Sequence, residues 1–297
     1  MIPHRQPITG RTRIVGVIGH PVGHSLSPAM QNAAFDALGM DYRYVAFDVA
    51  PGDVGGALAG MRALGLAGLN VTIPHKTAVY ELVDDRAPSA EAVRAVNTVE
   101  LRDGRAIGHN TDGEGFARSL SEAGVPLRDQ RVVLLGAGGA ARSVAAALQD
   151  RGAASLTILN RTRERAVEMI QWLDERARAI PGGGKNTLLS AGTPDEGESS
   201  IRSASIVVQC TSVGMSPHQE DPPPIPASWI QPSMVVYDLI YNPRETRLLA
   251  LARAAGAKAM NGVEMLIYQG AIAFEIWTGV FPPIDVMRRA LLEALGE

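Results

Sequence analysis

The chain has 297 residues, of which 46% are hydrophobic and 20% are charged, and its formal net charge is −3. This composition is typical of a globular protein with one large domain or two ordinary ones. No apolar run reaches about 18 residues, which argues against a transmembrane helix and a membrane partner. The mildly acidic charge without basic clusters argues against nucleic acid as a partner.

The N-terminus and the cysteine count favour a cytoplasmic location. Residues 1–13 lack the apolar segment of a signal peptide. Cys210 is the only cysteine, so no internal disulfide can form, as is usual in a reducing compartment. No Cys/His cluster has the spacing of metal ligands, so we expect no metal.

In the first part of the chain, short apolar runs alternate with helical patterns. Residues 14–19, 42–49 and 66–73 are typical of strands, and residues 28–38 and 52–65 are typical of helices. This alternation predicts a mostly parallel sheet with helices on its faces.

Turn-forming residues mark a hairpin and a loop. Two apolar runs, residues 95–101 and 105–111, flank the Asp-Gly pair at 103–104, which is a signal for a hairpin turn. Residues 181–200 are rich in Gly, Pro and Ser and predict a surface loop around one short strand at 186–190.

The alternation of strands and helices restarts in the second half of the chain. Residues 131–152 and 155–173 each predict a strand, a turn and a helix, while residues 205–215 and 234–241 predict two more strands. Residues 263–296 have helical patterns.

The pattern divides the chain into two domains. We place the boundaries near residues 112–116 and near Gly262. The predicted fold class is α/β, with one domain formed by residues 1–115 plus 263–297 and the other by residues 116–262. The C-terminal helices are expected to return to the first domain.

A glycine-rich turn predicts a dinucleotide site. Residues 132–142 (VVLLGAGGAAR) fit G-x-G-x-x-G/A at a strand-to-helix junction, through Gly136, Gly138 and Ala141. Gly136 permits the tight turn, Gly138 lets the backbone approach a pyrophosphate, and the helix N-terminus offers unpaired N–H groups. Glycine-rich turns often only pack a helix on a strand, so the prediction depends on the flanking strand and helix.

The next predicted strand ends in a basic sequence. An NAD site has Asp or Glu about 20 residues after the glycines, to hold the ribose 2′-hydroxyl. This chain has Asn160, Arg161, Thr162 and Arg165 instead. Two guanidinium groups suit the 2′-phosphate of NADP, which is therefore the favoured cofactor. Asn160 or Thr162 can also cap the following helix, and the two roles are compatible.

Polar residues that can carry chemistry follow the strands of the first domain. The sequence LNVTIPHK holds Asn70, Thr72 and Lys76, while Asn97 and Asp112 come further along the chain. Open α/β sheets bind ligands at the carboxyl ends of their strands. Hydride transfer from an alcohol needs a base, and a lysine positioned by a carboxylate can take the hydroxyl proton. Taken singly, a lysine is usually a solvated surface charge, and an Asp before a helix is usually its N-cap.

The ordered motifs of the whole chain resemble those of the shikimate dehydrogenase family. They are HSLSP, NVTIPHK, AVNT, NTDGEGF, GAGGAAR, NRT, TSVGM, YDLIYNPRET and NGVEMLIYQGAIAFEIWTG. The resemblance implies that residues 1–115 plus 263–297 form a substrate-binding domain, and that residues 116–262 form a Rossmann NADP-binding domain. It also implies the reversible, NADP-dependent reduction of 3-dehydroshikimate to shikimate, in aromatic amino acid biosynthesis.

The resemblance implies roles for individual residues of the substrate site. Lys76 is the implied catalytic base, paired with Asp112. Ser25 and Ser27 are implied to bind the substrate carboxylate, with Tyr241 nearby. The residues implied to face the ring hydroxyls, besides Asp112, are Asn70, Thr72, Asn97 and Gln269. Tyr241 is also compatible with a packing role, and Gln269 with a position facing solvent.

The cofactor residues that the resemblance implies all lie in the second domain. They are Gly136, Ala137, Gly138, Gly139, Ala140, Asn160, Arg161, Thr162, Arg165, Thr211, Leu239 and Gly262. Ser212 and Met215 are implied to belong to the loop on the nicotinamide side, although Met215 is also compatible with a core position.

The sequence departs from the family pattern at three places. Gln31 stands where the family often has His, Arg94 replaces a common Gly, and Gln209-Cys210 replaces the usual Asn-Ala. None of these changes removes a proposed catalytic group. Cys210 has no neighbouring motif of a nucleophile, and we interpret it as a packing residue.

Other functions remain open on the sequence. A quinate/shikimate dehydrogenase would accept a broader range of substrates and often uses NAD. A non-catalytic ligand sensor on the same scaffold would lack Lys76 or Asp112, and both are present. A folate-type dehydrogenase fits the serine pair less well. We expect a small-molecule partner and a monomer or homodimer.

Overall fold

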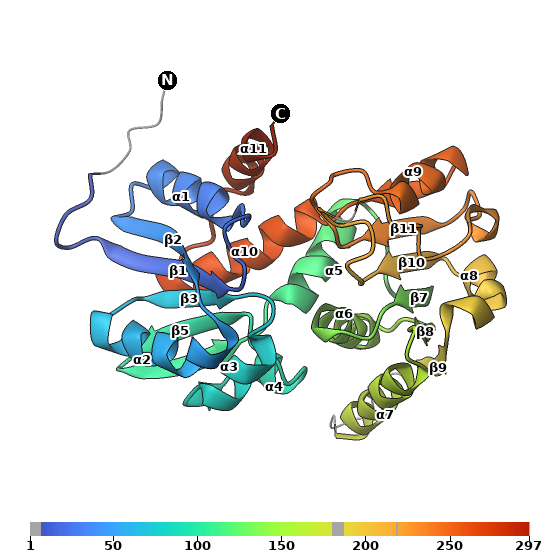
Figure 1. Cartoon of the computed structure of the whole chain (residues 1–297), viewed down its shortest axis with the longest axis horizontal. Coiled ribbons are helices and arrows are strands. Elements are labelled where there is room, and N and C mark those ends of the chain that lie inside the picture. The colour runs from blue at the N-terminus through green and yellow to red at the C-terminus, as the bar shows by residue number, and fades with distance from the viewer. Residues whose placement is uncertain (1–6, 180–186, 218, 297) are drawn as a thin grey trace. The chain divides into compact units, whose positions relative to one another are not determined.

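The chain folds into two compact units, each described here by itself (Figure 1). The computed structural model describes residues 7–179, 187–217 and 219–296. Unit 1 comprises residues 1–115 and 267–297, and unit 2 comprises residues 116–266. Over the described residues, each unit contains a six-stranded sheet.

The sheet of unit 1 is mixed, with strand order β2-β1-β3-β5-β6-β4. Its strands are β1 (Arg13–Gly19), β2 (Tyr42–Asp48), β3 (Gly68–Val71), β4 (Asp85–Arg86), β5 (Thr98–Arg102) and β6 (Arg105–His109). β1 pairs in parallel with β2 and β3, and β4 pairs in parallel with β6. β5 is antiparallel to both β3 and β6. The predicted mostly parallel sheet is therefore confirmed, with β5 as the reversed strand.

The turn between β5 and β6 has the geometry that its sequence predicts. Asp103 and Gly104 have φ angles of 50° and 76°. A type I′ hairpin turn requires a positive φ at both central residues, which Asp-Gly tolerates better than most pairs. The turn pairs Arg102 with Arg105 and fixes the register of the hairpin.

Helices cover both faces of the unit 1 sheet. Unit 1 contains α1 (Ser27–Ala37), α2 (Val54–Leu64), α3 (Lys76–Leu82), α4 (Pro88–Glu91), most of α10 (Val263–Thr278) and α11 (Ile284–Ala294). Leu58 and Met61 of α2 pack on Leu69 from one side of the sheet. On the other side, Phe35 of α1 stacks on Phe274 of α10. The C-terminal helices therefore return to unit 1, as predicted.

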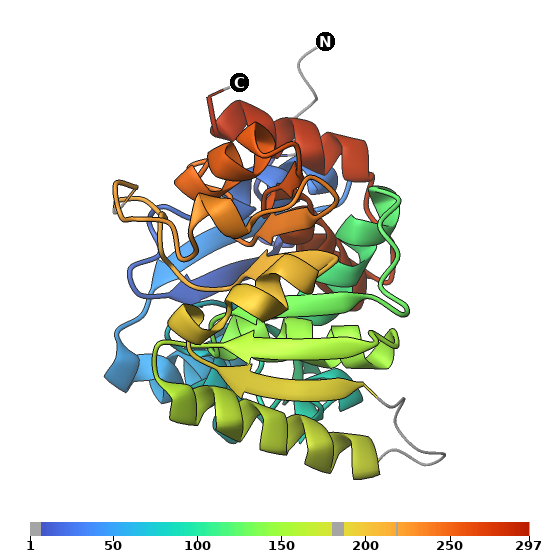
Figure 2. The same ribbon diagram turned by 90° about the vertical axis from the view of Figure 1, so that its right-hand side faces the viewer.

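Unit 2 has the strand order of a dinucleotide-binding fold. Its sheet order is β12-β11-β10-β7-β8-β9, and every neighbouring pair is parallel. The strands are β7 (Arg131–Leu135), β8 (Ser155–Leu159), β9 (Leu188–Gly192), β10 (Ile206–Gln209), β11 (Val235–Asp238) and β12 (Lys258–Met260). The strand order reverses between β7 and β10, which is where open parallel sheets bind their ligands. Figure 2 shows the parallel strands face on.

The helices of unit 2 differ in part from the prediction. They are α5 (Asp112–Glu122), which begins in unit 1, α6 (Gly139–Asp150), α7 (Arg163–Ala179), α8 (Glu198–Ser203) and α9 (Arg247–Ala254). The predicted loop at 181–200 is wrong at its end, where α8 begins. The predicted strand at 186–190 is β9 at Leu188–Gly192, and Asn186 lies outside the described residues. α9 and β12 were not predicted.

Candidate active site and cofactor cavity

An ion pair joins two helix starts in unit 1. Lys76 is the first residue of α3 and Asp112 is the first residue of α5. The Lys76 Nζ atom lies 2.6 Å from Asp112 Oδ2, with 21% of the lysine side chain and 7% of the aspartate side chain exposed. The partial positive charge of the α5 N-terminus favours a carboxylate there. The ammonium group is therefore held by a buried carboxylate while remaining accessible to a ligand.

Asn97 fixes the other oxygen of the carboxylate. Its Nδ2 donates to Asp112 Oδ1 at 2.7 Å, and its Oδ1 accepts the backbone N–H of Thr111 at 2.9 Å. Gln269 Oε1 lies 3.4 Å from the same Nδ2, so Gln269 belongs to the cluster rather than to the solvent-facing surface. The structure thus brings Lys76, Asp112, Asn97 and Gln269 together.

Asn70 extends this cluster toward β2. Its Nδ2 donates to the backbone carbonyl of Asn97 at 3.2 Å and to Thr98 Oγ1 at 3.0 Å. Its Oδ1 accepts the hydroxyl of Tyr44 at 2.8 Å. A backbone carbonyl can only accept, so the orientation of the Asn70 amide is fixed. Sequence analysis missed Tyr44 and Thr98, because Tyr and Thr are ordinary residues in any strand.

The serine pair lies at the start of α1. Ser27 is the first residue of this 11-residue helix, and Ser25 Oγ accepts the Ser27 N–H at 3.4 Å. A helix N-terminus with two hydroxyls favours an anion. Thr72 is half-buried and follows β3, where its N–H donates to the carbonyl of Ile18 at 2.9 Å.

Two departures from the family pattern have structural explanations in unit 1. Gln31 is fully buried, and its Nε2 donates to the carbonyl of Gly270 at 2.9 Å, which ties α1 to α10. Arg94 is exposed and has a φ of 51°. This left-handed conformation favours glycine, so the backbone at Arg94 suits the glycine that is common in the family.

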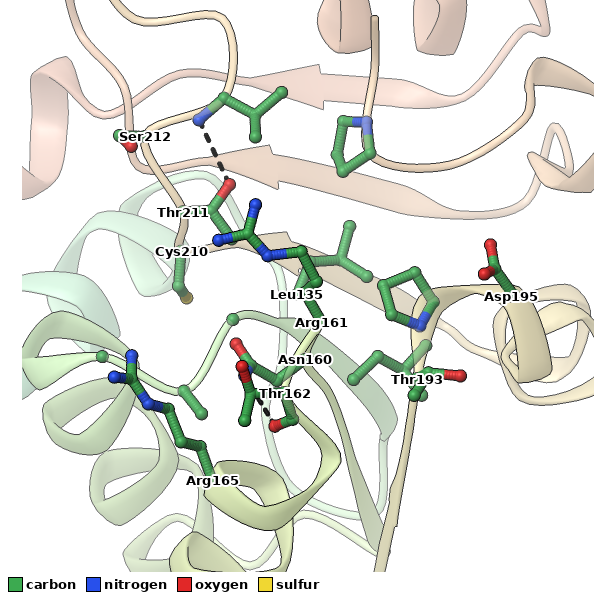
Figure 3. A pocket seen from close by; sticks show the side chains of 17 residues that line it. Leu135, Asn160, Arg161, Thr162, Arg165, Thr193, Asp195, Cys210, Thr211 and Ser212 are labelled. Atoms are coloured by element: carbon green, nitrogen blue, oxygen red, sulfur yellow. Dashed lines mark hydrogen bonds between the residues drawn. The ribbon is translucent and has the colours of Figure 1, made fainter.

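Unit 2 holds a cavity of about 710 Å³ at the carboxyl ends of β7, β8 and β10 (Figure 3). Its lining includes eight of the predicted cofactor residues: Gly136, Ala137, Gly138, Asn160, Arg161, Thr162, Arg165 and Thr211. Ser212 lines it as well. The cavity therefore occupies the reversal in strand order where a dinucleotide is expected.

The glycine turn is shaped for close approach of a ligand. Gly136 has a φ of 110°, and a Cβ there would lie 2.8 Å from Thr211 Cγ2. A Cβ at Gly138 would meet no atom within 4 Å, so the backbone before α6 is open. The first N–H groups of α6 can then meet a pyrophosphate. Gly139 and Ala140 begin α6, outside the lining of the cavity.

Two arginines of the β8–α7 turn offer positive charge to the cavity. Arg163 pairs with Glu196 at 2.8 Å. In the part of the chain that the structure describes, Arg161 and Arg165 have no such acidic partner and both line the cavity. Asn160 Nδ2 donates to the carbonyl of Thr162 at 2.8 Å and orders the turn between them. Figure 3 shows both guanidinium groups beside the cavity.

The cavity residues that sequence analysis missed include Thr193, Pro194, Asp195 and Pro224. The first three follow β9 in a turn that Thr193 and Glu196 close as a capping box. Thr-x-x-Glu after a strand is a readable signal for such a turn. Pro224 has no comparable signal.

The Gln209 side chain shapes the loop after β10. Its Oε1 accepts both the N–H and the hydroxyl of Thr211 at 3.0 Å, and its Nε2 donates to the carbonyl of Val213 at 3.2 Å. Cys210 also lines the cavity, and burial raises the pKa of its thiol. A thiol that keeps its proton is a poor nucleophile, which supports the packing interpretation.

The other predicted residues of unit 2 are not among those that line this cavity. Gly262 lies against Leu239, where a Cβ would come within 2.0 Å of the Leu239 carbonyl oxygen. Tyr241 follows β11 in unit 2 and is half-buried, and burial raises the pKa of its phenol. Met215 is 39% exposed, so it is not a core residue. The binding roles of Leu239, Tyr241 and Gly262 stay predictions.

No described helix has the length and apolar character needed to cross a membrane. Within residues 7–179, 187–217 and 219–296, no group of three or more His, Cys, Asp or Glu side chains is placed to hold a metal ion.

Known families match most of the chain. The shikimate dehydrogenase substrate-binding domain matches residues 17–99, the shikimate/quinate 5-dehydrogenase family matches residues 118–215, and the shikimate 5′-dehydrogenase C-terminal domain matches residues 262–292. The shikimate dehydrogenase (NADP(+)) of Methanopyrus kandleri is 49% identical over 97% of this chain and 98% of that protein.

Solved structures agree with these matches. Shikimate 5-dehydrogenase from Thermus thermophilus, in complex with NADP(H) and shikimate, has a TM-score of 0.84 and 35% identity over 95% of this chain and 99% of that one. Quinate dehydrogenase from Corynebacterium glutamicum, in complex with NAD, has a TM-score of 0.86 and 31% identity over 95% and 99%. With near-complete coverage at this identity, the chain belongs to the shikimate dehydrogenase family.

Proposed function

We propose that the chain catalyses the reversible, NADP-dependent oxidation of shikimate to 3-dehydroshikimate. The observation that carries this proposal is the Lys76–Asp112 pair at 2.6 Å, set among the buried amides of Asn97 and Asn70. Residues 1–115 plus 263–297 are the substrate-binding domain, and residues 116–262 are the NADP-binding domain.

Lys76 is the acid-base residue of the proposed reaction. During oxidation its Nζ takes the proton of the reacting hydroxyl, and during reduction it returns that proton. Asp112 holds Nζ from one side, while Asn97 holds the second carboxylate oxygen at 2.7 Å. These contacts fix the position of Nζ, where it exchanges the proton of the reacting hydroxyl.

The substrate ligands surround this pair. Ser25 and Ser27, at the N-terminus of α1, bind the carboxylate of shikimate. The ring hydroxyls are bound by Asn70, Thr72, Asn97, Asp112 and Gln269. Tyr241 of unit 2 binds near the carboxylate. These assignments are supported by the hydrogen-bonded cluster of Asn70, Asn97 and Gln269.

The cavity of unit 2 fits NADP. The turn at Gly136 to Ala140 and the start of α6 receive the pyrophosphate. Asn160, Arg161, Thr162 and Arg165 hold the adenosine end, where the two arginines bind the 2′-phosphate. When bound, NADP⁺ accepts a hydride from the carbon that carries the reacting hydroxyl. Thr211 is assigned to the loop on the nicotinamide side, and Leu239 and Gly262 are assigned to the cofactor site.

The test replaces the proposed base. Lys76→Met should lower kcat by about 10²–10⁴-fold and change the dissociation constant of shikimate little, because the lost group acts mainly on the proton. Turnover is followed by the absorbance of the reduced nicotinamide. Lys258→Met, at an exposed lysine of unit 2, is the matched control and should leave kcat unchanged. An unchanged kcat in Lys76→Met would contradict the assignment.

A second candidate is a quinate/shikimate dehydrogenase of broader range, favoured by the similarity to the quinate dehydrogenase fold. The same assay separates the two when shikimate and quinate are each tested with NADP⁺ and NAD⁺. Turnover confined to shikimate with NADP⁺ supports the first candidate. Strong turnover of quinate supports the second.

The cellular compartment, the partner and the oligomeric state of the enzyme are also proposals. A single cysteine suits the reducing cytoplasm. We assign the chain a small-molecule partner and a monomeric or homodimeric state, which light scattering of the purified protein measures directly.

A further inference from the structure

The cavity of unit 2 carries a carboxylate that the proposed phosphate contacts do not explain. Among the described residues that line the cavity, Asp195 is the one acid, and it shares the cavity with Arg161 and Arg165. It is exposed, and no basic side chain of the described residues pairs with it. A carboxylate beside a ligand that carries phosphates costs repulsion. Asp195 therefore favours binding only where it faces a part of the ligand that donates hydrogen bonds.

A short, closed turn holds Asp195 at the wall of the cavity. Asp195 lies in the single 3₁₀ turn Pro194–Glu196, which follows β9. A capping box closes this turn, because the Thr193 hydroxyl accepts the Glu196 N–H and the Glu196 carboxylate accepts the Thr193 N–H at 3.2 Å. Pro194 begins the turn and has a fixed φ. The backbone that carries Asp195 is thus set in place by its own sequence.

The strand order assigns this turn to the adenine end of a bound dinucleotide. β10, β7, β8 and β9 are consecutive neighbours in the sheet. In this fold the turn after β7 meets the pyrophosphate, and the residues after β8 meet the adenosine ribose. The Asn160 N–H donates to the Gly192 carbonyl at 3.1 Å and joins the ends of β8 and β9. The turn after β9 therefore lies beyond the ribose, on the side of the base.

The residues beside Asp195 suit a flat base that carries an amine. Pro194 and Pro224 also line the cavity and offer it apolar surface. Figure 3 shows Asp195 and Arg165 on opposite sides of the cavity, so the carboxylate is not turned toward that guanidinium. An ionised carboxylate only accepts hydrogen bonds, and the exocyclic N6 amino group of adenine donates them.

We propose that Asp195 is a specificity-determining residue that selects adenine as the base of the cofactor, by accepting a hydrogen bond from the N6 amino group. The proposal rests on the proposed function, because NADP is the ligand of this cavity only there. A base with an oxo group in place of the amino group would present an acceptor to the carboxylate. The hydrogen bond would then be lost and two acceptors would face each other.

The test compares NADP⁺ with its deamino analogue, in which hypoxanthine replaces adenine and an oxo group replaces the amino group. Calorimetry without shikimate gives both dissociation constants, so the measurement does not depend on turnover. The wild-type protein should bind NADP⁺ roughly tenfold more tightly than the analogue, which is the effect of one hydrogen bond to a charged group. In Asp195→Asn the two dissociation constants should become similar, because a side-chain amide can accept from the amino group or donate to the oxo group.

Glu198→Gln is the matched control, because it removes the same charge from a residue close to the turn. Glu198 begins α8, lies outside the lining of the cavity and pairs with Arg202 at 2.8 Å. This variant should keep the wild-type preference for NADP⁺. A preference that persists in Asp195→Asn overturns the proposal. If both dinucleotides bind more tightly by the same factor, Asp195 acts only as a like charge near the phosphates.

The wild-type protein separates failure of this proposal from failure of the proposed function. If neither dinucleotide binds, NADP is not the ligand of the cavity and both proposals fail. If NADP⁺ and its deamino analogue bind equally tightly, the cofactor assignment stands and only the role of Asp195 is wrong.

Discussion

Asp238, at the end of β11, is a fully buried carboxyl group in unit 2. It accepts the Thr246 hydroxyl at 2.7 Å and the N–H of Ile240 at 3.0 Å. Desolvation outweighs these hydrogen bonds and raises the pKa of Asp238 to about 6. Through Ile240 and Thr246 this carboxyl ties down both ends of the segment that carries Tyr241.

The raised pKa of Asp238 predicts how stability depends on pH. The folded protein keeps this proton above the ordinary pKa of 3.8, where the unfolded chain has lost it. The free energy of unfolding should therefore fall as the pH rises from about 4 to about 6, by about 3 kcal/mol from this group, and stay level above. Urea unfolding across this range measures the effect.

Asp238→Asn is the comparison for that experiment, because its side chain is neutral at every pH. The difference in unfolding free energy between the wild-type protein and this variant should change between about pH 4 and pH 6. A difference that stays constant over the range would show that Asp238 does not titrate there.

At the scale of single elements, the β8–α7 turn sets the choice of cofactor. Arg161→Ala should raise the KM for NADP⁺ roughly 10- to 100-fold, because one charged partner of the 2′-phosphate is lost. The KM for NAD⁺, which lacks that phosphate, should change little. Initial rates with each cofactor at saturating shikimate measure both values.

Arg163→Ala is the matched control in the same turn. Its guanidinium is occupied by Glu196 at 2.8 Å, so neither KM should move. Equal losses for NADP⁺ and NAD⁺ in Arg161→Ala would argue against the 2′-phosphate role of Arg161.

Elements with a local signal were predictable, and those held by tertiary contacts were not. The β5–β6 hairpin follows from Asp103-Gly104, which the chain itself specifies. α8 has six residues and one buried side chain, Ile201, too little for a helical period to show. The start of α9 does carry a signal, since Thr246 caps it by accepting the Leu249 N–H.

At the scale of the whole molecule, unit 1 is built from two stretches of chain, 1–115 and 267–297. Met287 and Leu291 of α11 are fully buried, and α11 packs on α1. The last helix is therefore part of the core of the unit that begins the chain.

Because α11 belongs to the core of unit 1, a destabilising substitution in α11 should destabilise unit 1 more than unit 2. Leu291→Ala should lower the free energy of unfolding by about 2–5 kcal/mol, through lost burial and the cavity left behind. Hydrogen exchange should speed up in β1, β2 and β3 more than in β7 and β10. Leu248→Ala, at a buried leucine of α9, is the matched control and should have the opposite pattern. Equal exchange in both units after Leu291→Ala would contradict the assignment of α11.

The sequence predicted the residues of the site that belong to recognisable motifs and missed the residues that belong to none. Lys76 and Asp112 are 36 residues apart, and nothing local joins them. The resemblance paired them, and the structure shows the pair. Tyr44 and Thr98 belong to the same cluster but carry no motif, so only the packing of β2, β3 and β5 reveals them.

The two-stretch construction of unit 1 also sets the order in which the protein matures on the ribosome. Translation completes the sequence of unit 2 at Leu266, before the segment Ile267–Glu297 of unit 1 exists. Domains generally fold as units while synthesis proceeds. Although the sheet of unit 1 is translated first, two of its helices, α10 and α11, are translated last. A nascent chain should therefore acquire the nucleotide-binding fold while still tethered, and the fold around Lys76 only once its final helix emerges.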